Sequence, residues 1–315
     1  MVTSASATSL IAIDWGTSSL RAARLDTQGA MLEERAWPRG ILTVPPGGFA
    51  NAWREAVGDW TAAHPRAPCL IAGMAGSQQG WREAAYAPCP ASLADLTRQR
   101  CRLSAADGLL ADEQVAIVGG LCCEHDGVPD VMRGEETQVL GACALLGLRD
   151  ATVVLPGTHS KWVDLRDGCI QGFHTWMSGE FYALLQQHSI LARTLPDLQA
   201  PAAPFDETAF GQGVAQALRS TSLLASAFSV RSLSLFNRLP LDSRPAYLSG
   251  LVIGEELRAA PRHHRQRPMV LVGDATLVAR YQSAMKQCQF DTLAIGSQAT
   301  WRGLWEIAQH SPHAP

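Results

Sequence analysis

Glycine and small hydroxyl residues follow an apolar run near the start of the chain. Leu10 to Ile13 has the length and branching of a buried strand, which Asp14 ends. A second strand-like run, Leu20 to Leu25, follows a turn made of Gly16, Thr17, Ser18 and Ser19. This arrangement gathers backbone N–H groups and hydroxyls in one concavity, which suits phosphate oxygens. The alternative is an ordinary hairpin, because Ser and Thr are common in turns.

Asp14 stands at the end of the first strand, beside that concavity. Mg²⁺ in proteins is usually held by one or two carboxylates together with substrate phosphates and water. We therefore expect Asp14 to be a ligand of a hydrated Mg²⁺.

The same pattern of strand, turn and strand returns at Ala151 to Trp162. Lys161 could neutralise charge that develops on a transferred phosphoryl group. His159 is either a phosphate ligand or, like most single histidines, structural. The residues that could surround phosphate oxygens here are Gly157, Thr158 and Ser160.

A glycine-rich loop, Gly73 to Trp81, follows the short predicted strand Cys69 to Ala72. Ligands of open α/β sheets bind at the carboxyl ends of strands. Ser77 and Gln78 offer hydrogen bonds to sugar hydroxyls, and Trp81 offers a flat apolar wall. A plain strand-to-helix turn explains each of these residues equally well.

Two acidic residues, Glu135 and Glu136, begin a predicted helix that contains Val139 and Leu140. Acidic residues in a first turn favour the helix dipole, which accounts for one Glu. The helix dipole accounts less well for the whole cluster Glu-Glu-Thr-Gln, which directly follows Arg133 and Gly134. Small residues further along, from Gly141 to Ala144, permit close packing against another helix.

Composition narrows the classes of protein. A chain of 315 residues predicts two domains or lobes, and 47% hydrophobic residues are ample for their cores. The net charge of −3 and the absence of a long basic run argue against a nucleic-acid binder. The apolar runs are too short to span a membrane, and the N-terminus lacks the pattern of a secretion signal. We expect a soluble cytoplasmic protein.

Other common sites are missing from the sequence. The 8 cysteines include no Cys-x-x-Cys pair, so neither a zinc site nor a disulfide framework is expected. The chain has no Gly-Lys-Ser/Thr, which excludes a P-loop, and no Gly-x-Gly-x-x-Gly after a strand.

Several motifs resemble those of known phosphotransferases. Asp14, Gly16, Thr17 and Arg21 fit the Asp-x-Gly-Thr/Ser-x-x-x-Arg/Lys loop of the sugar-kinase, actin and heat-shock ATPase superfamily. Three longer segments resemble, more narrowly, the 2-dehydro-3-deoxygalactonokinase family, which phosphorylates a keto-deoxy sugar acid. They are Gly73 to Ser77, Met132 to Gln138 and Pro156 to Trp162.

The resemblance implies an α/β fold of two ribonuclease-H-like, actin-like ATPase lobes with a nucleotide cleft between them. The N-terminal lobe, 1–147, would hold the first phosphate loop and the substrate loop. The C-terminal lobe, 148–315, would hold the second phosphate loop and an adenosine-binding turn. The hairpins at Asp14 and Pro156 would face each other across the triphosphate. The superfamily has an Asp where this chain has Pro156, so metal anchoring would depend on Asp14.

The implied activity is transfer of the ATP γ-phosphate to the terminal hydroxyl of 2-dehydro-3-deoxy-D-galactonate, with ATP and Mg²⁺ as cofactors. In the exopolyphosphatases a similar element reads Glu-Glu-Ala-Arg, and its second Glu is catalytic. Carried over, Glu136 would accept the proton of the substrate hydroxyl. If Glu136 proves dispensable, Glu135 or another residue would be the base.

The resemblance also implies the binding residues. Asp274 would bond a ribose hydroxyl or only cap its helix. Either Arg133 or Arg21 would pair with the substrate carboxylate. The expected sugar-acid site comprises Gly76, Ser77, Gln78, Trp81, Arg133 and Glu135. The expected nucleotide site comprises Asp14, Gly16, Thr17, Ser18, Gly157, Thr158, His159, Gly273 and Asp274.

Other functions remain open at this point. Glu136 could orient a water molecule in a phosphatase or polyphosphatase, and the acceptor could be another keto-deoxy sugar acid. A non-catalytic nucleotide sensor is a further alternative. Phosphate release with and without added sugar acid separates a kinase from a phosphatase. A homodimer is possible, and the other expected partner is the small-molecule substrate.

Overall fold

The computed structural model describes residues 7–197, 199, 201, 203–260 and 267–310. The chain divides into two compact units. Unit 1 comprises Met1–Ala151, Val163–Phe173 and Ser297–Pro315, and unit 2 comprises Thr152–Trp162 and His174–Gly296. These units are discontinuous in sequence, whereas the expected lobes 1–147 and 148–315 are contiguous. The contiguous division stays a prediction.

A six-stranded sheet, in the order β3-β2-β1-β4-β7-β6, forms the centre of unit 1. β1 pairs antiparallel with β2 and parallel with β4. β1 reads Leu-Ile-Ala-Ile-Asp-Trp, and all of its residues except Asp14 are buried, as the apolar run predicts. The strands are β1 (Leu10–Trp15), β2 (Leu20–Leu25), β3 (Met31–Trp37), β4 (Cys69–Gly73), β6 (Cys101–Arg102) and β7 (Val115–Ile117).

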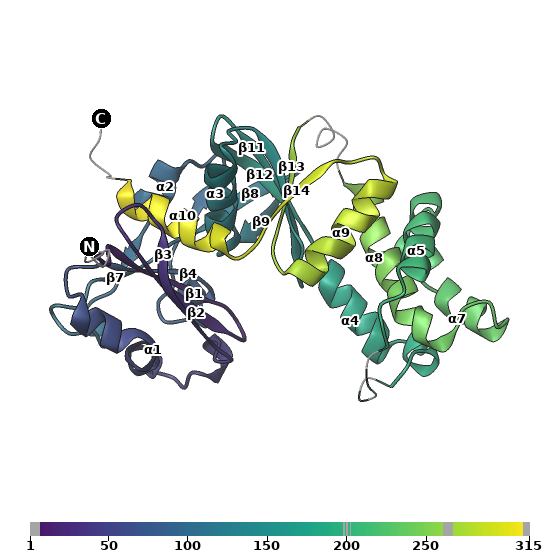
Figure 1. Cartoon of the computed structure of the whole chain (residues 1–315), viewed down its shortest axis with the longest axis horizontal. Coiled ribbons are helices and arrows are strands. Elements are labelled where there is room, and N and C mark those ends of the chain that lie inside the picture. Colours follow the sequence, from purple (N-terminus) through teal and green to yellow (C-terminus); the bar gives the residue numbers. More distant parts are fainter. Residues whose placement is uncertain (1–6, 198, 200, 202, 261–266, 311–315) are drawn as a thin grey trace, which may run out of the picture. The chain divides into compact units, whose positions relative to one another are not determined.

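Helices of unit 1 pack closely where they carry small residues. α3 (Glu135–Leu146) and α10 (Gln298–Gln309) lie side by side, although nearly half of the chain separates them in sequence (Figure 1). A Cβ at Gly141 would lie 1.8 Å from the Ala299 carbonyl oxygen, and one at Gly303 would lie 1.9 Å from that of Thr137. The predicted close packing of the small-residue helix is confirmed, with α10 as its partner.

Two further helices and a second sheet also belong to unit 1. α1 (Phe49–Ala63) buries Trp53 and Trp60 in the core, as its helical spacing predicts. A second, three-stranded sheet has the order β5-β8-β9 and was not predicted. Its strands and the remaining helix are β5 (Tyr86–Pro88), β8 (Gly120–His125), β9 (Val128–Met132) and α2 (Leu93–Arg98).

The remaining sheet has five strands in the order β12-β11-β10-β13-β14. If its strands are renumbered along the chain, this is the order 3-2-1-4-5, which the first sheet also follows for β1, β2, β3, β4 and β7. The repeat confirms the predicted duplication of a ribonuclease-H-like α/β unit. The strands are β10 (Ala151–Leu155), β11 (Ser160–Arg166), β12 (Cys169–Trp176), β13 (Met269–Val272) and β14 (Thr292–Ile295).

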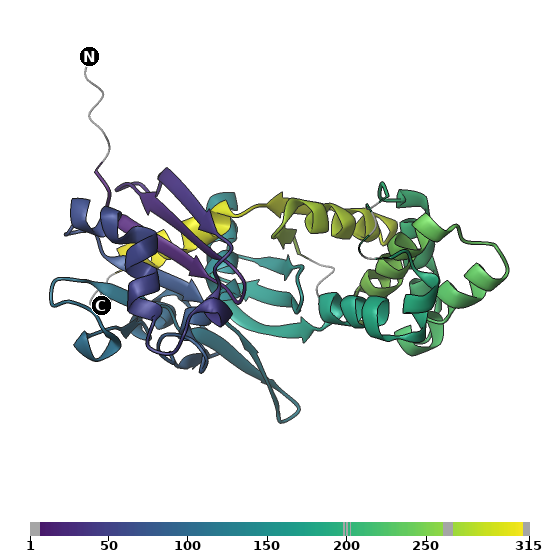
Figure 2. The same ribbon diagram turned by 90° about the horizontal axis from the view of Figure 1, so that it is seen from below.

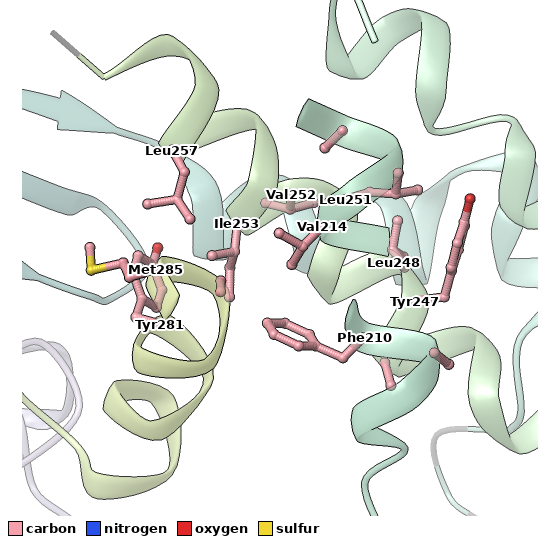
Figure 3. Close-up of a cluster of buried hydrophobic side chains, with 14 of the residues drawn as sticks. Phe210, Val214, Tyr247, Leu248, Leu251, Val252, Ile253, Leu257, Tyr281 and Met285 are labelled. Atoms are coloured by element: carbon pink, nitrogen blue, oxygen red, sulfur yellow. The ribbon is translucent and has the colours of Figure 1, made fainter. Parts of the chain in front are cut away.

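The helices between β12 and β13 gather into one group in unit 2 (Figure 2). Gly250 and Gly254 of α8 permit a close crossing with α5: a Cβ at Gly250 would lie 2.1 Å from the Phe210 carbonyl oxygen. Apolar side chains of α5, α8 and α9 fill the space between these helices (Figure 3). The helices of unit 2 are α4 (Ser178–His188), α5 (Glu207–Arg219), α6 (Leu223–Ser226), α7 (Ser229–Leu235), α8 (Arg244–Ala259) and α9 (Ala275–Gln287).

Among the described residues, no helix combines the length and the apolar character that crossing a bilayer requires.

The crossing of α3 and α10 gives a stability prediction. Gly141→Ala should lower the free energy of unfolding by roughly 1–3 kcal/mol, because the added methyl group overlaps the α10 backbone. The matched control is Gly58→Ala in α1, where the nearest atom to a Cβ is 3.6 Å away. That change should stabilise the protein by roughly 0.5–1 kcal/mol through helix propensity. Urea unfolding of both variants checks the pair, and equal stabilities would contradict the packing.

Candidate active site

The first hairpin places Asp14 and Arg21 opposite each other on β1 and β2. Arg21 Nη2 lies 2.5 Å from Asp14 Oδ2, so this arginine pairs with the aspartate. The Gly16 N–H donates to the Ser19 carbonyl at 2.9 Å and closes the turn. Thr17 and Ser18 are exposed, so the turn presents hydroxyl groups to solvent beside a half-buried carboxylate.

Three backbone segments of unit 1 meet beside Asp14. Gly73 and Gly134 have φ angles of 91° and 104°, a region that favours glycine. A Cβ at Gly73 would lie 2.9 Å from the Trp15 carbonyl oxygen and 3.3 Å from Asp14 Oδ1. A Cβ at Gly134 would lie 3.1 Å from the Gly73 Cα atom. The structure thus brings the ends of β1 and β4 to the start of α3.

Glu136 is fully buried at this junction. The Gly134 N–H donates to both of its carboxylate oxygens, at 2.9 and 2.7 Å. Burial, together with the neighbouring charge of Glu135, raises the pKa of Glu136 to about 8. A carboxyl group with such a pKa takes up a proton readily near neutral pH, as a general base must.

Glu135 is less buried than Glu136. Its Oε2 accepts a hydrogen bond from the Arg133 backbone N–H at 2.9 Å. Both glutamates therefore hold the turn that precedes α3, while their side chains differ in access to solvent.

Arg133 is a buried cation with unused hydrogen-bonding capacity. Its Nη2 donates to the Ala84 carbonyl at 2.8 Å, and its guanidinium lies 4.2 Å from the Tyr86 ring centroid. Its Nε and Nη1 atoms are buried and have no hydrogen-bond partner among the described residues. A Cβ at Gly76 would lie 2.9 Å from Nη1, so the glycine-rich loop passes directly over this cation. Buried donors of this kind ordinarily have partners.

The rest of the glycine-rich loop is polar at one end and aromatic at the other. Ser77 Oγ donates to the Met74 carbonyl at 2.8 Å, and Gln78 is exposed. Trp81 stacks on Phe49 at 6.4 Å between ring centroids and donates from Nε1 to the Asp107 carbonyl at 3.0 Å. Trp81 also lines an open pocket with Phe49 and Gln79. The tryptophan thus packs in the core and still faces a cavity.

The second hairpin turn in unit 2 lies against the start of α4. A Cβ at Gly179 would lie 2.5 Å from the Gly157 carbonyl oxygen, so only glycine fits there. The Glu180 N–H donates to the Thr158 carbonyl at 3.0 Å. His159 Nε2 lies 2.6 Å from Glu180 Oε2, and both side chains are partly exposed. His159 therefore already has a carboxylate partner.

Lys161 is buried on β11, and its Nζ donates to Thr175 Oγ1 at 2.7 Å. Its neighbours Ser160 and Trp162 both donate to Glu256 Oε1, at 2.7 and 2.6 Å. Successive side chains of a strand point to opposite faces. Lys161 therefore faces away from the Glu256 side of the sheet.

Gly273 and Asp274 lie between β13 and α9, close to the second hairpin. A Cβ at Gly273 would lie 3.6 Å from the Pro156 carbonyl oxygen. Asp274 Oδ1 accepts from the Thr276 and Leu277 N–H groups at 3.0 and 3.1 Å, so Asp274 caps α9. A small pocket opens nearby; its lining includes Gly157, Ser178, Gly179, Ser249, Leu277 and Tyr281.

The residues around Asp14 fit a Mg²⁺ ion that is shared with phosphates. Within the described ranges, no group of three or more His, Cys, Asp or Glu side chains could hold a metal by itself. Mg²⁺ needs only one or two carboxylates when phosphates and water complete its shell. Asp14 Oδ2 is used by Arg21, and Oδ1 lies beside Gly73, where the absence of a side chain leaves room.

Sequence reasoning missed the central polar group of unit 2. Glu256 is buried and also accepts hydrogen bonds from Ser178 Oγ and from Tyr281 Oη, the latter at 2.7 Å. One feature of the sequence could have indicated this role: Glu256 follows Ile253 by three residues and so lies on the apolar face of α8. The expected nucleotide and substrate residues themselves stay predictions.

Comparison with known proteins gives a consistent result. The family model described as 2-keto-3-deoxy-galactonokinase matches residues 14–307. The 2-dehydro-3-deoxygalactonokinase of Escherichia coli (strain K12) is 35% identical over 301 residues, which cover 95% of this chain and 97% of that protein.

Solved structures agree. A crystal structure described as a candidate 2-dehydro-3-deoxygalactonokinase from Sinorhizobium meliloti has a TM-score of 0.84 and 33% identity, over 95% of this chain and 98% of that one. A candidate N-acetylglucosamine kinase from Porphyromonas gingivalis has a TM-score of 0.51 and 12% identity, over 96% of this chain and 100% of that one, which shows the fold alone. The chain belongs to the 2-keto-3-deoxy-galactonokinase family.

Proposed function

We propose that this protein is an ATP-dependent kinase that phosphorylates the terminal hydroxyl of 2-dehydro-3-deoxy-D-galactonate and gives the 6-phosphate. Membership of the family across nearly the whole chain supports this activity. The observation that carries the chemistry is the buried Glu136 carboxylate, with its raised pKa, beside the turn that holds Asp14. We also propose a cytoplasmic location, where ATP is available. We further propose a homodimer, which a molar mass from light scattering would test.

The two hairpin turns would hold the phosphates. Backbone N–H groups and hydroxyls of Gly16, Thr17 and Ser18 in unit 1 would bind phosphate oxygens, and so would those of Gly157, Thr158 and His159 in unit 2. Asp14 would hold Mg²⁺, which when bound neutralises phosphate charge. Lys161 would add positive charge at the second turn. Its contact with Thr175 keeps its Nζ within the sheet. Lys161 would therefore act mainly through the electrostatic field of its charge and not by direct contact with a phosphate.

The adenosine would lie at Gly273 and Asp274 and in the adjoining pocket. Gly273 lies next to Pro156, which links the base site to the second phosphate turn. Two faces of the pocket come from α4 and α9, whose first residues lie beside these turns. Asp274 caps α9 and keeps one oxygen, Oδ2, for a ribose hydroxyl.

The sugar acid would bind between the glycine-rich loop and Arg133. The unused Nε and Nη1 donors of Arg133 match a substrate carboxylate. Arg21, the other candidate, already pairs with Asp14, so we favour Arg133. Gly76 leaves room above the guanidinium, Ser77, Gln78 and Glu135 would bond hydroxyls, and Trp81 would close one side. Binding requires a small rearrangement, because these donor atoms are buried.

Glu136 would take the proton from the terminal hydroxyl as that oxygen attacks the γ-phosphorus atom. The bond from the γ-phosphorus to the bridging oxygen of ADP breaks, and the proton stays on Glu136 until the product leaves. Burial favours the protonated, neutral carboxyl group, which makes the proton transfer favourable. Exclusion of water from this junction would favour the sugar hydroxyl over hydrolysis.

A direct assay tests the activity. ATP consumption should depend on the keto-deoxy sugar acid and yield one sugar phosphate per ADP, because the base is positioned for the sugar hydroxyl. Phosphate release and phosphosugar formation are measured together over a panel of keto-deoxy sugar acids. Free phosphate that appears at the same rate without a sugar acid would instead indicate the phosphatase alternative.

Replacement of Glu136 tests the base. Glu136→Gln should lower kcat about 10²–10⁴-fold, the usual contribution of a general base, while the affinity for ATP changes little. In the native enzyme, kcat/KM should rise with pH until about 8, because the base must be deprotonated, and should then level off. Steady-state kinetics from pH 6 to pH 9 measure both quantities.

Glu135→Gln is the matched control for Glu136→Gln. It removes the adjacent charge, so the pH midpoint should fall while most of the activity remains. If Glu135→Gln abolishes turnover and Glu136→Gln does not, the roles of the two glutamates are exchanged.

Replacement of Arg133 tests the carboxylate contact. Arg133→Lys should raise the KM for the sugar acid about 10–100-fold, because a charged hydrogen bond contributes roughly 1.5–3 kcal/mol. The KM for ATP should stay unchanged. The methyl ester of the substrate should bind the native enzyme weakly and the variant no worse. Arg39→Lys, at an exposed ion pair with Glu55, is the control. Equal losses on the acid and on its ester would refute the contact.

A further inference from the structure

Large apolar side chains are exposed along one segment of unit 2, from α6 to the short 3₁₀ helix η5 (Leu241–Ser243). Leu224 is 91% exposed and Phe236 is 74% exposed, and the other members are about half exposed or more. Single exposed apolar residues are normal on a protein surface, whereas a group of them within one segment marks an interaction site. We call the group the apolar patch; it consists of Leu224, Phe228, Leu235, Phe236 and Leu241.

α6 and α7 are apolar on two faces. Val230 is fully buried, and Leu233 packs beside it against the core of unit 2. Leu224, Phe228 and Leu235 lie on the opposite face, because the link between the two helices keeps right-handed helical dihedral angles. A surface helix ordinarily has one apolar and one polar face, and a helix that is apolar all round is buried. α7 instead lies at the margin of its helix group (Figure 1). The second apolar face therefore requires a partner.

The segment around the patch carries few charges. No residue from Ser220 to Val230 is charged, and Arg231 is the only charged residue from there to Asn237. A nucleic acid or an anionic membrane surface would instead need a cluster of Lys and Arg. Depletion of charge together with enrichment of aromatic residues is typical of the core of a protein–protein interface. The chemistry of the segment thus favours a protein partner.

Two exposed side chains of opposite charge border the patch. The Arg238 guanidinium lies 6.0 Å from the Phe236 ring centroid, and Asp242 directly follows Leu241. Neither Arg238 nor Asp242 forms an ion pair with another residue of the described ranges. In a two-fold contact the same surface of both copies meets, so residue i faces residue j and j faces i. Arg238 could then pair with Asp242 of the partner subunit, and this pair would form twice. The border of the patch is therefore complementary to itself.

The size of the patch fits a subunit interface. Its exposed fractions together amount to about three complete side chains. At roughly 150 Å² for one large apolar side chain, the patch offers about 500 Å². A standard interface covers about 800 Å² on each partner, and about 65% of a homodimer interface is apolar, which is again about 500 Å². The patch by itself can supply the apolar part of such an interface.

We propose that the apolar patch is the contact surface between two copies of this chain, related by a two-fold axis. This inference rests on the proposed homodimer, to which it gives an interface, and does not depend on phosphoryl transfer. A second copy is favoured over a different protein, because the patch combines an apolar centre with border charges of both signs. Phe228 and Leu235, which share one helix face, would lie at the centre of the contact.

Sedimentation of the full chain over a range of protein concentrations tests the proposal. The native protein should be a dimer. Phe228→Asp and Leu235→Asp should each raise the dimer Kd at least about 100-fold, because each change removes two central contacts and buries two charges. Both side chains are exposed, so the variants should keep the native circular dichroism spectrum. The matched control is Leu110→Asp, which charges a similarly exposed leucine of unit 1 and should leave the dimer intact.

A charge exchange tests the two-fold pairing. Arg238→Asp should weaken the dimer several-fold, because it places acidic groups opposite each other. The double variant Arg238→Asp with Asp242→Arg restores opposite charges and should regain most of the native affinity. A double variant no tighter than Arg238→Asp alone would contradict the pairing.

Two results would overturn the proposal. A native protein that stays monomeric at all concentrations would reject both the homodimer and its interface. A native dimer that persists in both Phe228→Asp and Leu235→Asp would keep the homodimer and reject this surface. Sedimentation needs no substrate, so a failed sugar-acid assay would reject the proposed reaction alone.

Discussion

Close approach of three backbone segments determines the site in unit 1. The ends of β1 and β4 and the start of α3 meet at Gly73 and Gly134, and both glycines have positive φ angles. A side chain at Gly73 would collide with the backbone of Trp15, and one at Gly134 would press on Gly73. Because the segments touch without side chains, the carboxyl groups of Asp14 and Glu136 are brought to one junction. The glycines thus position the acidic groups without themselves reacting.

In unit 2 a buried side chain, Glu256, holds separate segments together, whereas unit 1 relies on close contact between backbones. The unit 2 elements β11, α4 and α9 all have a residue that donates to Glu256. One buried carboxylate therefore fixes three elements that come from distant parts of the chain. Gly157 and Gly179 add a close contact of the kind seen in unit 1. Buried polar groups need such complete hydrogen bonding to be tolerated.

The sequence allowed most of the strands and helices to be predicted, because their patterns are local. The buried run Leu10 to Ile13, the hydroxyl turn after it and the helical spacing of Trp53 and Trp60 all depend on neighbours within a few residues. The three-stranded sheet was missed, since β5 and β9 have only 3 and 5 residues and expose several of them. Short exposed strands carry little alternation of apolar and polar residues.

The candidate site was predictable in part, for a related reason. Motifs identified the turns, and the structure adds partners that a linear sequence does not display. Arg21 pairs with Asp14, His159 with Glu180, and Lys161 with Thr175. Each pair joins residues between seven and twenty-one positions apart. The role of Glu256 depends on donors from β11, α4 and α9, which only the folded chain brings together.

The return of α10 to unit 1 has a consequence for how the protein forms. Residues 298–309 pack on α3, whereas all of unit 2 lies between these helices in the sequence. During synthesis, therefore, the glycine face of α3 emerges from the ribosome long before its partner exists. Unit 2 can complete its own core first, and unit 1 must wait with an incomplete layer. A protein built in this way completes its N-terminal unit last, only after residues 298–309 have been synthesised.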